Sequence, residues 1–555
     1  MKNKYREILW LFRVIQPFGM PLIKLSLMGS LLSLVGVGIA IISKGMIDSA
    51  VDGYLEQAVW AGIIFVLLIL LQVCIRAFLT ILTARTKTII QNTLQIKIYK
   101  CLMNASWKNY SKYHSGDLMT RMTSDIKIIS DNIVTIIPDI ISLGVGLTAA
   151  FIVLFYFDDN LAILAFVMIL AALVLNRLFG QRIKFAHSQI QDREGVYRGI
   201  THETLMHMLL LKSFCREENV LSQISQAQET RKEWILKKNI LSALGRSLLV
   251  LGYWSGYFLA FYWGVSGLYA GTISFGTMAA FLQLVGQVQG PVIGLAYTYP
   301  QMIATLASAE RILEIEEIPP DVSISQANEG KSGSFVRAGL EMVDVSFSYR
   351  EDQPLLSHIN LQIPPGEVVA LTGASGSGKS TLIQLILALL TPDKGEVLLV
   401  DEYGKRWKAN AKTRSVIAYV PQGNSLISGT ILDNILMGNP KASVDEISEA
   451  VKQSDAWEFI KKLPEGFMTK VGEKGVGLSE GQAQRIAITR ALVKHAPFLI
   501  LDEATSWLGM ESNRKVIETL RNLDPPRTCI IVTHQERTIK ACDRIFLLQN
   551  GKLYT

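Results

Sequence analysis

One stretch of the sequence decides how the second half of the chain folds, and it reads Gly373-Ala374-Ser375-Gly376-Ser377-Gly378-Lys379-Ser380-Thr381. A short apolar run, Val368–Thr372, precedes it, and a helical pattern, Thr381–Leu390, follows it. This strand–loop–helix order is typical of a phosphate-binding loop, in which glycines let backbone N–H groups surround phosphate oxygens at a helix N-terminus. We therefore predict an α/β nucleotide-binding domain rather than a glycine-rich turn without a ligand.

Individual residues of this loop suit different parts of ATP and its Mg²⁺ ion. Lys379 carries the positive charge expected beside the β- and γ-phosphates. Ser380 offers a hydroxyl ligand to Mg²⁺. The predicted nucleotide-binding residues of the stretch are Gly373, Ser375, Gly376, Ser377, Gly378, Lys379, Ser380 and Thr381.

A second motif lies downstream, where the apolar run Phe498–Leu501 ends in Asp502 and Glu503. A continuous apolar run is typical of a parallel strand that is covered on both faces. Asp502 is placed to hold Mg²⁺ through water, and Glu503 is placed to orient or deprotonate an attacking water. Such a run is weak evidence alone, but after a phosphate-binding loop it predicts ATP hydrolysis.

The first half of the chain is predicted to lie in a membrane. Of the 555 residues, 49% are hydrophobic and 19% are charged, and the mean hydropathy is +0.29. A membrane-spanning helix needs about 20 apolar residues, and six runs qualify: 21–43, 58–82, 133–156, 160–178, 245–269 and 274–299. No short apolar core with a cleavage site precedes them, so no cleaved signal peptide is expected. The predicted organisation is an all-α transmembrane six-helix domain at 1–315, a linker at 316–337 and an α/β ATPase domain at 338–555.

The charge distribution indicates how the spans are oriented. The net charge of +7 would fit a nucleic-acid binder or a membrane protein with basic loops, but the basic residues lie between apolar runs, at 83–132 and 180–244. The short loops on the other side are acidic, with Asp48, Asp52 and Asp159 among them. Basic loops mark the cytoplasmic side, so both termini and the ATPase domain are predicted to be cytoplasmic, with no nucleic-acid partner. The five cysteines form no CxxC pair, so neither a zinc site nor a disulfide framework is expected.

Further motifs give the chain a specific resemblance. Leu478-Ser479-Glu480-Gly481-Gln482 resembles the ABC signature, Tyr349 resembles the aromatic platform for adenine, Gln422 resembles the Q-loop glutamine, and His534 resembles the switch histidine. The chain is thus similar to ABC transporters of the exporter type, with a P-loop ABC ATPase domain after the membrane domain. The resemblance implies ATP and Mg²⁺ as cofactors. It implies catalysis by Glu503, His534 and Gln422, nucleotide contacts from Tyr349, Ser479, Gly481 and Gln482 as well as the loop, and a metal site made by Ser380, Gln422 and Asp502.

The membrane half carries the resemblance further. Ser115–Asp125 is similar to the first coupling segment of six-span exporters, and the region from Glu203 to Glu217 is similar to the second. The resemblance implies an ATP-driven half-transporter in a bacterial plasma membrane, which exports an amphipathic peptide, lipid or drug. It also implies a second half-transporter subunit whose signature closes over ATP, with a homodimer as the simplest expectation and a heterodimer left open. An ATP-gated channel or sensor is the alternative function.

Four positions depart from the family pattern. Glu480 replaces a glycine of the signature, Gly509 stands where an aspartate is usual, His207 occupies a frequent glycine position, and the chain ends at Thr555. Gly509 lacks the carboxylate that the loop between subunits normally has, which makes a heterodimer more plausible.

Uncharged polar groups inside a membrane face partners or water. The predicted cavity face therefore comprises Gln283 and Gln287, with Gln289, Tyr297 and Tyr299 nearby and Tyr253, Trp254, Tyr257, Tyr262 and Trp263 on the fifth span.

Overall fold

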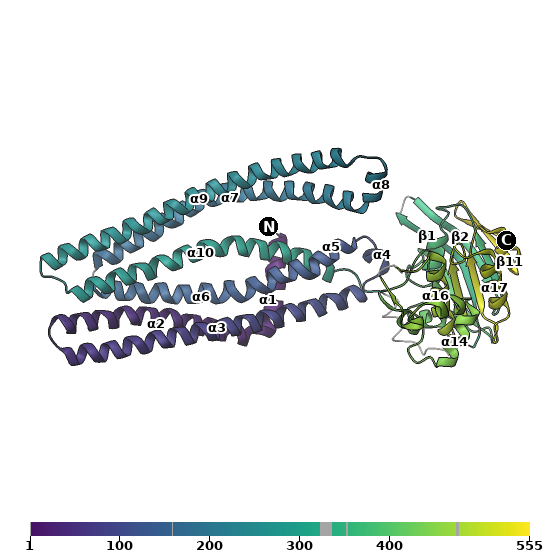
Figure 1. Cartoon of the computed structure of the whole chain (residues 1–555), viewed down its shortest axis with the longest axis horizontal. Coiled ribbons are helices and arrows are strands. Elements are labelled where there is room, and N and C mark those ends of the chain that lie inside the picture. The colour runs from purple at the N-terminus through teal and green to yellow at the C-terminus, as the bar shows by residue number, and fades with distance from the viewer. Residues whose placement is uncertain (1, 158, 322–335, 351–352, 473–476) are drawn as a thin grey trace. The chain divides into compact units, whose positions relative to one another are not determined.

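The structure is a computed structural model that describes residues 2–157, 159–321, 336–350, 353–472 and 477–555, apart from some side chains in the long helices. The chain divides into two compact units. Unit 1 comprises Met1–Tyr99 and Gly116–Ile315, and unit 2 comprises Lys100–Ser115 and Glu316–Thr555. Helices form unit 1, whereas unit 2 combines sheets and helices (Figure 1). The predicted fold class, an all-α membrane domain followed by an α/β ATPase domain, is confirmed.

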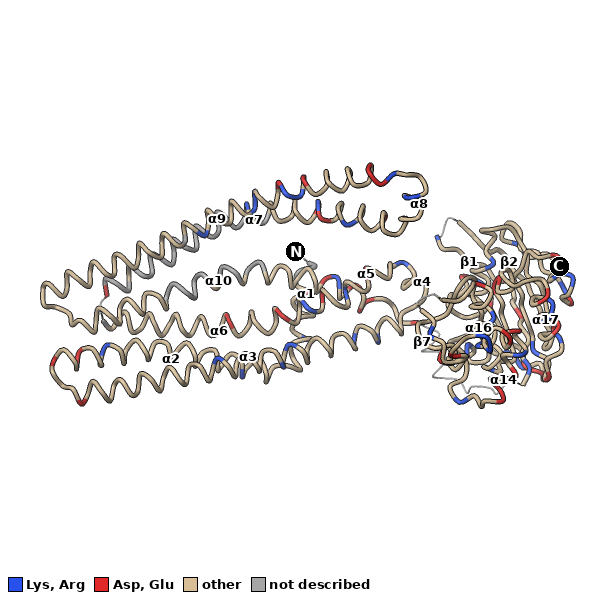
Figure 2. The backbone as a smooth tube through the Cα atoms, viewed as in Figure 1, with Lys and Arg blue, Asp and Glu red and all other residues tan. Residues whose placement is uncertain are grey.

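Unit 1 is built from long helices joined by tight turns. Gly53 (φ +82°) and Gly271 (φ +70°) adopt the left-handed conformation in two of these turns, where a side chain would be strained. Figure 2 shows that the middle parts of α2, α3 and α6 have few charged residues. The long helices are α1 (Lys2–Ile15), α2 (Gly19–Val51), α3 (Leu55–Met103), α6 (Ile126–Phe157), α7 (Asp159–Met206), α9 (Glu217–Tyr269) and α10 (Phe275–Glu316).

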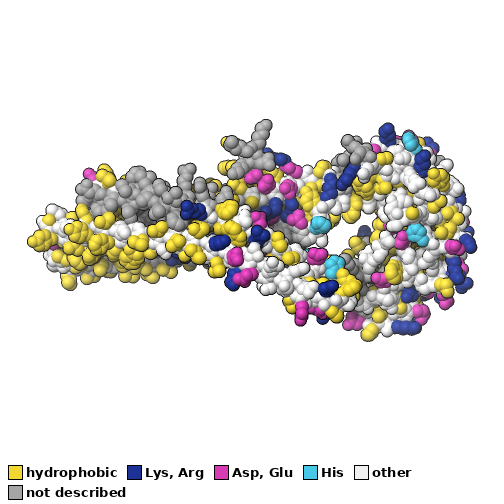
Figure 3. All heavy atoms as spheres, turned by 90° about the horizontal axis from the view of Figure 1, so that it is seen from above, with side chains coloured by type: hydrophobic (Ala, Val, Ile, Leu, Met, Phe, Trp, Pro, Cys, Tyr) yellow, Lys and Arg dark blue, Asp and Glu magenta, His cyan; other side chains and the backbone are white. Residues whose placement is uncertain are grey.

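Four helical stretches among the described residues are long and apolar enough to cross a bilayer. They are Tyr5–Val51, Leu55–Met103, Ser115–Tyr156 and Glu217–Tyr269. Figure 3 shows hydrophobic side chains over much of the described surface of this unit. The other two predicted spans, 160–178 and 274–299, fall in α7 and α10, where many side chains lie outside the described residues.

Small residues let α2 and α6 approach closely. A Cβ atom added to Gly146 would lie 2.9 Å from the Ser33 Cβ, and one added to Gly29 would lie 3.0 Å from the Ser142 Cβ. Ser33 Oγ also donates a hydrogen bond to the Ser142 carbonyl at 3.1 Å. Within a bilayer the hydrophobic effect does not drive helices together, because the lipid is as apolar as the side chains. Close packing of small residues and hydrogen bonds between the helices hold them together instead.

The glutamines predicted to line a cavity face α2. Gln283 Oε1 accepts a hydrogen bond from Ser43 Oγ at 3.2 Å. The Gln287 amide lies so close to Gly36 that an added Cβ would be 3.1 Å from its Nε2. Both amides therefore help to join α10 to α2, and the side chains of Gln289, Tyr297 and Tyr299 lie outside the described residues.

An ionic network around the buried Asp125 carboxylate ties the segment before α6 to the end of α10. Arg311 forms two charge-assisted bonds to Asp125, of which the Nε–Oδ2 bond is 2.7 Å long, and Ser308 Oγ donates to the same carboxylate at 3.0 Å. Arg121 binds Glu314 at 2.7 Å and Asp117 at 2.9 Å. The short helices α5 (Ser115–Thr120) and η2 (Arg121–Asp125) carry the first partners of this network.

Unit 2 holds a parallel sheet that is extended by one antiparallel strand. Its strand order is β12-β11-β3-β10-β9-β6, and only β12 runs antiparallel to its neighbour. The strands are β3 (Val368–Thr372), β6 (Ile417–Val420), β9 (Phe498–Asp502), β10 (Thr528–Val532), β11 (Arg544–Gln549) and β12 (Lys552–Tyr554). Every residue of β9 and β10 is buried, as expected for central strands covered on both faces.

An antiparallel sheet covers one side of this core, in the order β2-β1-β4-β5. Its strands are β1 (Ala338–Arg350), β2 (Gln353–Ile363), β4 (Lys394–Asp401) and β5 (Arg406–Lys408), and a small pair is formed by β7 (Gly429–Thr430) and β8 (Lys470–Val471). One hydrophobic core joins β1, β2 and β4 to α12 and the parallel sheet, and another joins the same sheet to α13–α17. The helices are α12 (Lys379–Ile386), α13 (Ile431–Leu436), α14 (Val444–Gln453), α15 (Trp457–Lys462), α16 (Glu480–Val493), α17 (Met510–Arg521) and α18 (Glu536–Lys540).

Unit 2 also includes a segment from the first half of the chain, Lys100–Ser115, which contains the short helix α4 (Trp107–Tyr110). Its Ser106 N–H donates to the Pro319 carbonyl, and its Asn104 carbonyl accepts from the Asp321 N–H at 2.8 Å. The Lys108 ammonium lies 5.5 Å from the centre of the Phe347 ring.

The predicted first coupling segment, Ser115–Asp125, begins where the chain passes from unit 2 to unit 1. From Gly116 onward the chain belongs to unit 1 and continues without a break through η2 into α6. The preceding segment, Lys100–Ser115, packs with the ATPase domain. In the second region, His207 forms the turn between α7 and α8 (Met208–Ser213).

Candidate nucleotide-binding and hydrolysis site

The phosphate-binding loop leaves the carboxyl end of β3 and opens α12. Gly373 (φ +152°) passes so close to β11 that an added Cβ would lie 2.3 Å from the Leu548 carbonyl oxygen. Gly376 and Gly378 have φ values of +79° and +104°, which other residues adopt only with strain. These three glycines curl the backbone into a concavity at the start of a helix, the geometry that binds anions.

Two side chains of the loop indicate that an anion belongs there. Lys379 is 9% exposed, and its ammonium donates to the carbonyls of Gly373 and Ala374, at 2.5 and 3.0 Å. Ser377 Oγ is buried, and none of the described groups pairs with it. The buried Ser377 hydroxyl would gain a hydrogen bond from a phosphate oxygen. The Lys379 ammonium, whose hydrogen bonds are to neutral carbonyls, would gain a charge-assisted bond.

Three predicted catalytic residues converge at the carboxyl ends of neighbouring strands. Gln422 follows β6, Glu503 follows β9 and His534 follows β10, and these strands are adjacent in the sheet. Gln422 Nε2 donates to Glu503 Oε2 at 2.7 Å, and His534 Nε2 lies 3.7 Å from Glu503 Oε1. Glu503 adopts a left-handed conformation (φ +51°), a sparsely populated state that is often found at functional sites.

Asp502 is the buried carboxylate of the site. It is 5% exposed, and its Oδ2 accepts a hydrogen bond from the Tyr419 hydroxyl at 3.2 Å. Burial raises the pKa of Asp502, while the Tyr419 hydrogen bond and the Lys379 charge act in the opposite direction and Glu503 adds to the rise. Tyr419 was not among the predicted site residues, because an aromatic residue in a short apolar strand gives no signal of its own.

The residues suit Mg²⁺ as the metal. Among the described residues, no group of three or more His, Cys, Asp or Glu could hold an ion. Mg²⁺ usually takes one or two protein oxygens and completes its shell with water and substrate phosphates. The buried Asp502 carboxylate and the Ser380 hydroxyl, which is exposed in the first turn of α12, are donors of that kind.

Tyr349 lies at the end of β1, next to the loop. Its ring packs edge-on against Phe347, with centroids 5.1 Å apart, and is 51% exposed. Its hydroxyl lies 3.3 Å from both Thr381 Oγ1 and Gln384 Oε1, which holds the ring beside α12. The position is compatible with the predicted adenine platform.

The signature residues form the N-terminus of α16. Ser479 is the N-cap: its Oγ accepts from the Gln482 N–H at 3.3 Å, and Gln482 Oε1 accepts from the Ser479 N–H at 3.0 Å. Gly481 packs against the loop that follows Glu503, where an added Cβ would lie 2.8 Å from the Trp507 carbonyl oxygen. No hydrogen bond joins these residues to the phosphate-binding loop within the described part of the chain. The structure thus brings the catalytic residues together, and none of the described hydrogen bonds links the signature to them.

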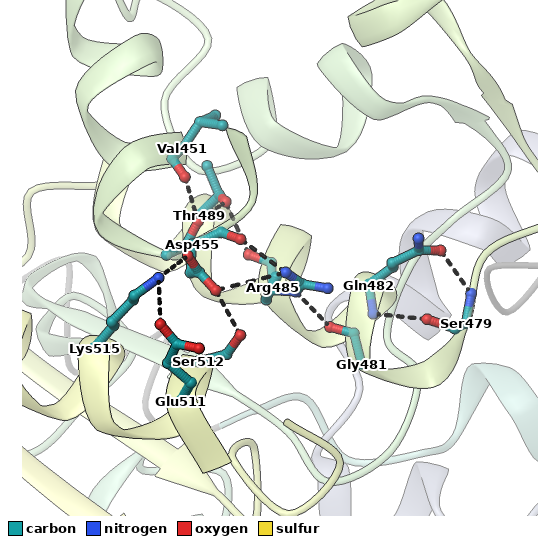
Figure 4. A network of polar contacts seen from close by, with 11 residues as sticks. Val451, Asp455, Ser479, Gly481, Gln482, Arg485, Thr489, Glu511, Ser512 and Lys515 are labelled. Carbon is teal, nitrogen blue, oxygen red and sulfur yellow. Dashed lines mark hydrogen bonds and ion pairs between the residues drawn. The ribbon is translucent and has the colours of Figure 1, made fainter. Parts of the chain in front are cut away.

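Asp455 fixes this helix to the next one (Figure 4). Arg485 of α16 donates to the Asp455 carbonyl at 2.9 Å, and its guanidinium lies 3.7 Å from the Asp455 carboxylate. On the other side, Lys515 of α17 approaches the same carboxylate at 3.5 Å, and Ser512 donates to it. Asp455 was missed in the sequence, since it lies in an ordinary polar turn between two helices.

The departures from the family pattern lie at the surface of this region. Glu480 is exposed in the first turn of α16. Gly509 is the N-cap of α17, and its carbonyl accepts from the Asn513 N–H at 2.9 Å. The preceding Trp507 is 62% exposed, so this loop presents a large aromatic side chain instead of a carboxylate.

Comparisons with known proteins agree with this fold. Residues 356–506 match the family model described as ABC transporter, and residues 23–292 match the ABC transporter transmembrane region. An ATP-dependent lipid A-core flippase of Syntrophus aciditrophicus is 30% identical over 92% of this chain and 85% of its own length. A putative multidrug export ATP-binding/permease protein of Bacillus subtilis is 29% identical over 89% of this chain and 84% of its own.

A solved structure of a bacterial Atm1-family ABC exporter with ATP bound has the same fold, with a TM-score of 0.82 over 98% of this chain and 96% of that one, at 23% identity. The chain belongs to the ABC transporter family. Within that family it is an exporter half-transporter, an integral membrane protein that binds and hydrolyses ATP and couples hydrolysis to transport. A half-transporter of this kind works with a second one.

Proposed function

We propose that two copies of this chain form an exporter that moves an amphipathic molecule, such as a lipid, drug or peptide, away from the cytoplasm. The cargo class is inferred from the relatives, whose names refer to lipid A-core flipping and multidrug export. The main observation that supports ATP hydrolysis as the energy source is the Gln422–Glu503–His534 cluster beside a phosphate-binding loop. The basic loops between the spans support a cytoplasmic ATPase domain in a bacterial plasma membrane.

Each site residue has a proposed part in hydrolysis. Lys379, Ser377 and the loop N–H groups bind the phosphates, and the Tyr349 ring stacks on adenine. Glu503 accepts the proton of the attacking water, which Gln422 and His534 hold in line. Ser380, Asp502 and Gln422 would hold Mg²⁺, which when bound neutralises phosphate charge.

The second copy completes the site. Ser479 and the N–H groups of Gly481 and Gln482 form a helix N-terminus, which favours anions but makes no hydrogen bond to the phosphate-binding loop of its own chain in the described residues. In the proposed dimer the partner's signature covers the γ-phosphate. ATP then holds the two ATPase domains together, and hydrolysis releases them.

The experiment compares ATPase activity and transport in lipid vesicles for the unmodified protein and Glu503→Gln. We expect the variant to bind ATP with the affinity of the unmodified protein. Its ATP turnover rate should be lower by about 100-fold or more, because the general base is gone. Glu518→Gln is the matched control, since that carboxylate is 61% exposed and, among the described residues, its ion pair is with Arg514 on the surface of α17. Turnover of Glu503→Gln at the control rate would remove Glu503 from the mechanism.

The homodimer is tested separately by mass photometry of Glu503→Gln with ATP and Mg²⁺. A single species of twice the chain mass supports two identical subunits. A monomer that dimerises and hydrolyses ATP only after another half-transporter is added would replace the homodimer with a heterodimer.

A further inference from the structure

A groove between α7 and α9 is separate from the ATP site and has a distinct chemical character. It encloses about 570 Å³ and is lined by Phe185, Trp234, Ile240 and Leu241 together with two cationic residues, Arg182 and Lys237. Phe185 is 61% exposed and Ile240 is 59% exposed, so the groove is open along one side. Apolar walls with cationic ends match an amphipathic anion.

The inner end of the groove lies close to the predicted spans of both helices. Arg182 is four residues after the span predicted at 160–178, and Leu241 is four residues before the span predicted at 245–269. At 1.5 Å per residue, four helical residues cover about 6 Å, which is the depth of the headgroup layer on one side of a bilayer. The outer end, at Trp234, is eleven residues from the span, or about 16 Å, and so lies on the aqueous side of that layer. Figure 2 shows charged residues in the part of this hairpin toward α8, and no charged residue occurs from Ser247 to Tyr269.

The aromatic and cationic residues are arranged as a receptor for a headgroup. The Phe185 and Trp234 rings meet edge to face, with centroids 6.0 Å apart, across the two helices. The Lys237 ammonium lies 4.7 Å from the centre of the Trp234 ring, which holds it at the groove. Among the described residues, no carboxylate forms an ion pair with Arg182 or Lys237, so both charges are available to an anion.

We propose that this groove binds an anionic phospholipid of the surrounding membrane, with its phosphate between Arg182 and Lys237 and its acyl chains toward the inner end of the groove, against Ile240 and Leu241. Charge complementarity favours this occupant over a purely apolar partner, because an apolar surface would desolvate two cations without compensation. The bound lipid is a structural ligand of the α7–α9 hairpin and is not the transported cargo.

The test is native mass spectrometry of the purified full-length protein with phosphatidylglycerol and phosphatidylcholine of the same chains. We expect phosphatidylglycerol to bind saturably, and Arg182→Ala/Lys237→Ala to weaken it about 30-fold, since each basic residue contributes roughly fivefold near an anionic surface. Lys238→Ala is the control for the lysine, because it removes one positive charge at the residue next to Lys237, outside the groove lining. Basal ATPase activity in detergent should be unchanged in all three proteins.

Several results would overturn the proposal. Equal affinity for the two lipids would mean an apolar groove without headgroup selection, and an equal loss in Lys238→Ala would mean general surface charge. No saturable binding by the unmodified protein would indicate that a second copy of the chain covers the groove. ATP-dependent movement of phosphatidylglycerol across vesicles, abolished by the double variant, would make the groove part of the cargo path.

Discussion

Removal of the Arg311 charge should destabilise the membrane unit more than any ordinary surface change. The Asp125 carboxylate is 2% exposed and receives two bonds from Arg311 and one from Ser308. Arg311→Met would leave that carboxylate buried with only the serine hydroxyl. Loss of one partner of a buried pair costs about 3–5 kcal/mol, and because the Arg311 side chain is 44% exposed we expect the lower end, about 3 kcal/mol.

This loss corresponds to a change of about 100-fold in the folding equilibrium. It can be measured as the midpoint of unfolding by sodium dodecyl sulfate in mixed micelles, followed by far-ultraviolet circular dichroism. Arg198→Met is the control, because that side chain is 75% exposed and its pair with Glu194 is worth about 0.5 kcal/mol or less. Arg311→Met/Asp125→Asn should recover most of the stability, since it removes the uncompensated charge.

The reasoning fails if Arg311→Met is no less stable than Arg198→Met. It also fails if the double variant is no more stable than Arg311→Met alone. In either case the Asp125 carboxylate would not depend on the guanidinium that binds it.

Three further predictions concern the ATPase domain. Ser443→Ala removes the capping box of α14, so thermal denaturation should show that the free energy of unfolding falls by about 1 kcal/mol. The ATPase activity per folded molecule should stay the same, and a loss of that activity would contradict the prediction. Burial raises the pKa of Asp502, so the folded domain without nucleotide holds that proton more tightly than the unfolded chain, and stability should fall as pH rises through this pKa. Denaturation scans of Asp502→Asn at successive pH values should lack that part of the fall, and an unchanged pH profile would refute it. Gly481→Ala places a Cβ 2.8 Å from the Trp507 carbonyl oxygen, so kcat should drop on the order of 10-fold to 100-fold while Glu480→Ala at the exposed neighbour keeps its rate.

The parts of the fold with strong local signals could be predicted from the sequence. The structure has β3 at Val368–Thr372 and β9 at Phe498–Asp502, the positions expected from their apolar runs. Helix α12 was predicted to reach Leu390 but ends at Ile386. Ala388 is left-handed (φ +49°), and Arg414 binds the carbonyls of Leu387 and Ala388, so the helix ends through a contact distant in sequence.

The site followed the same division. The phosphate-binding loop and the carboxylates at the end of β9 belong to local sequence patterns that are typical of nucleotide binding and hydrolysis. The strands β6, β9 and β10 are neighbours in the sheet, and this brings Gln422, Glu503 and His534 together. Asp455 acts through partners on two other helices, a role that no local pattern encodes. The unit boundary at Ser115–Gly116 could not be predicted either, because nothing in Ser115–Asp125 shows that this segment continues into α6.

The inclusion of Lys100–Ser115 in unit 2 means that the chain passes between the two units three times, at Tyr99–Lys100, Ser115–Gly116 and Ile315–Glu316. A protease that cuts only between residues 316 and 337 would therefore not free the ATPase domain as a whole. A soluble fragment that starts at residue 316 would be missing the groups that pair with Pro319 and Asp321. Biochemical work on the separated ATPase domain would need the 100–115 peptide added back to restore the native surface.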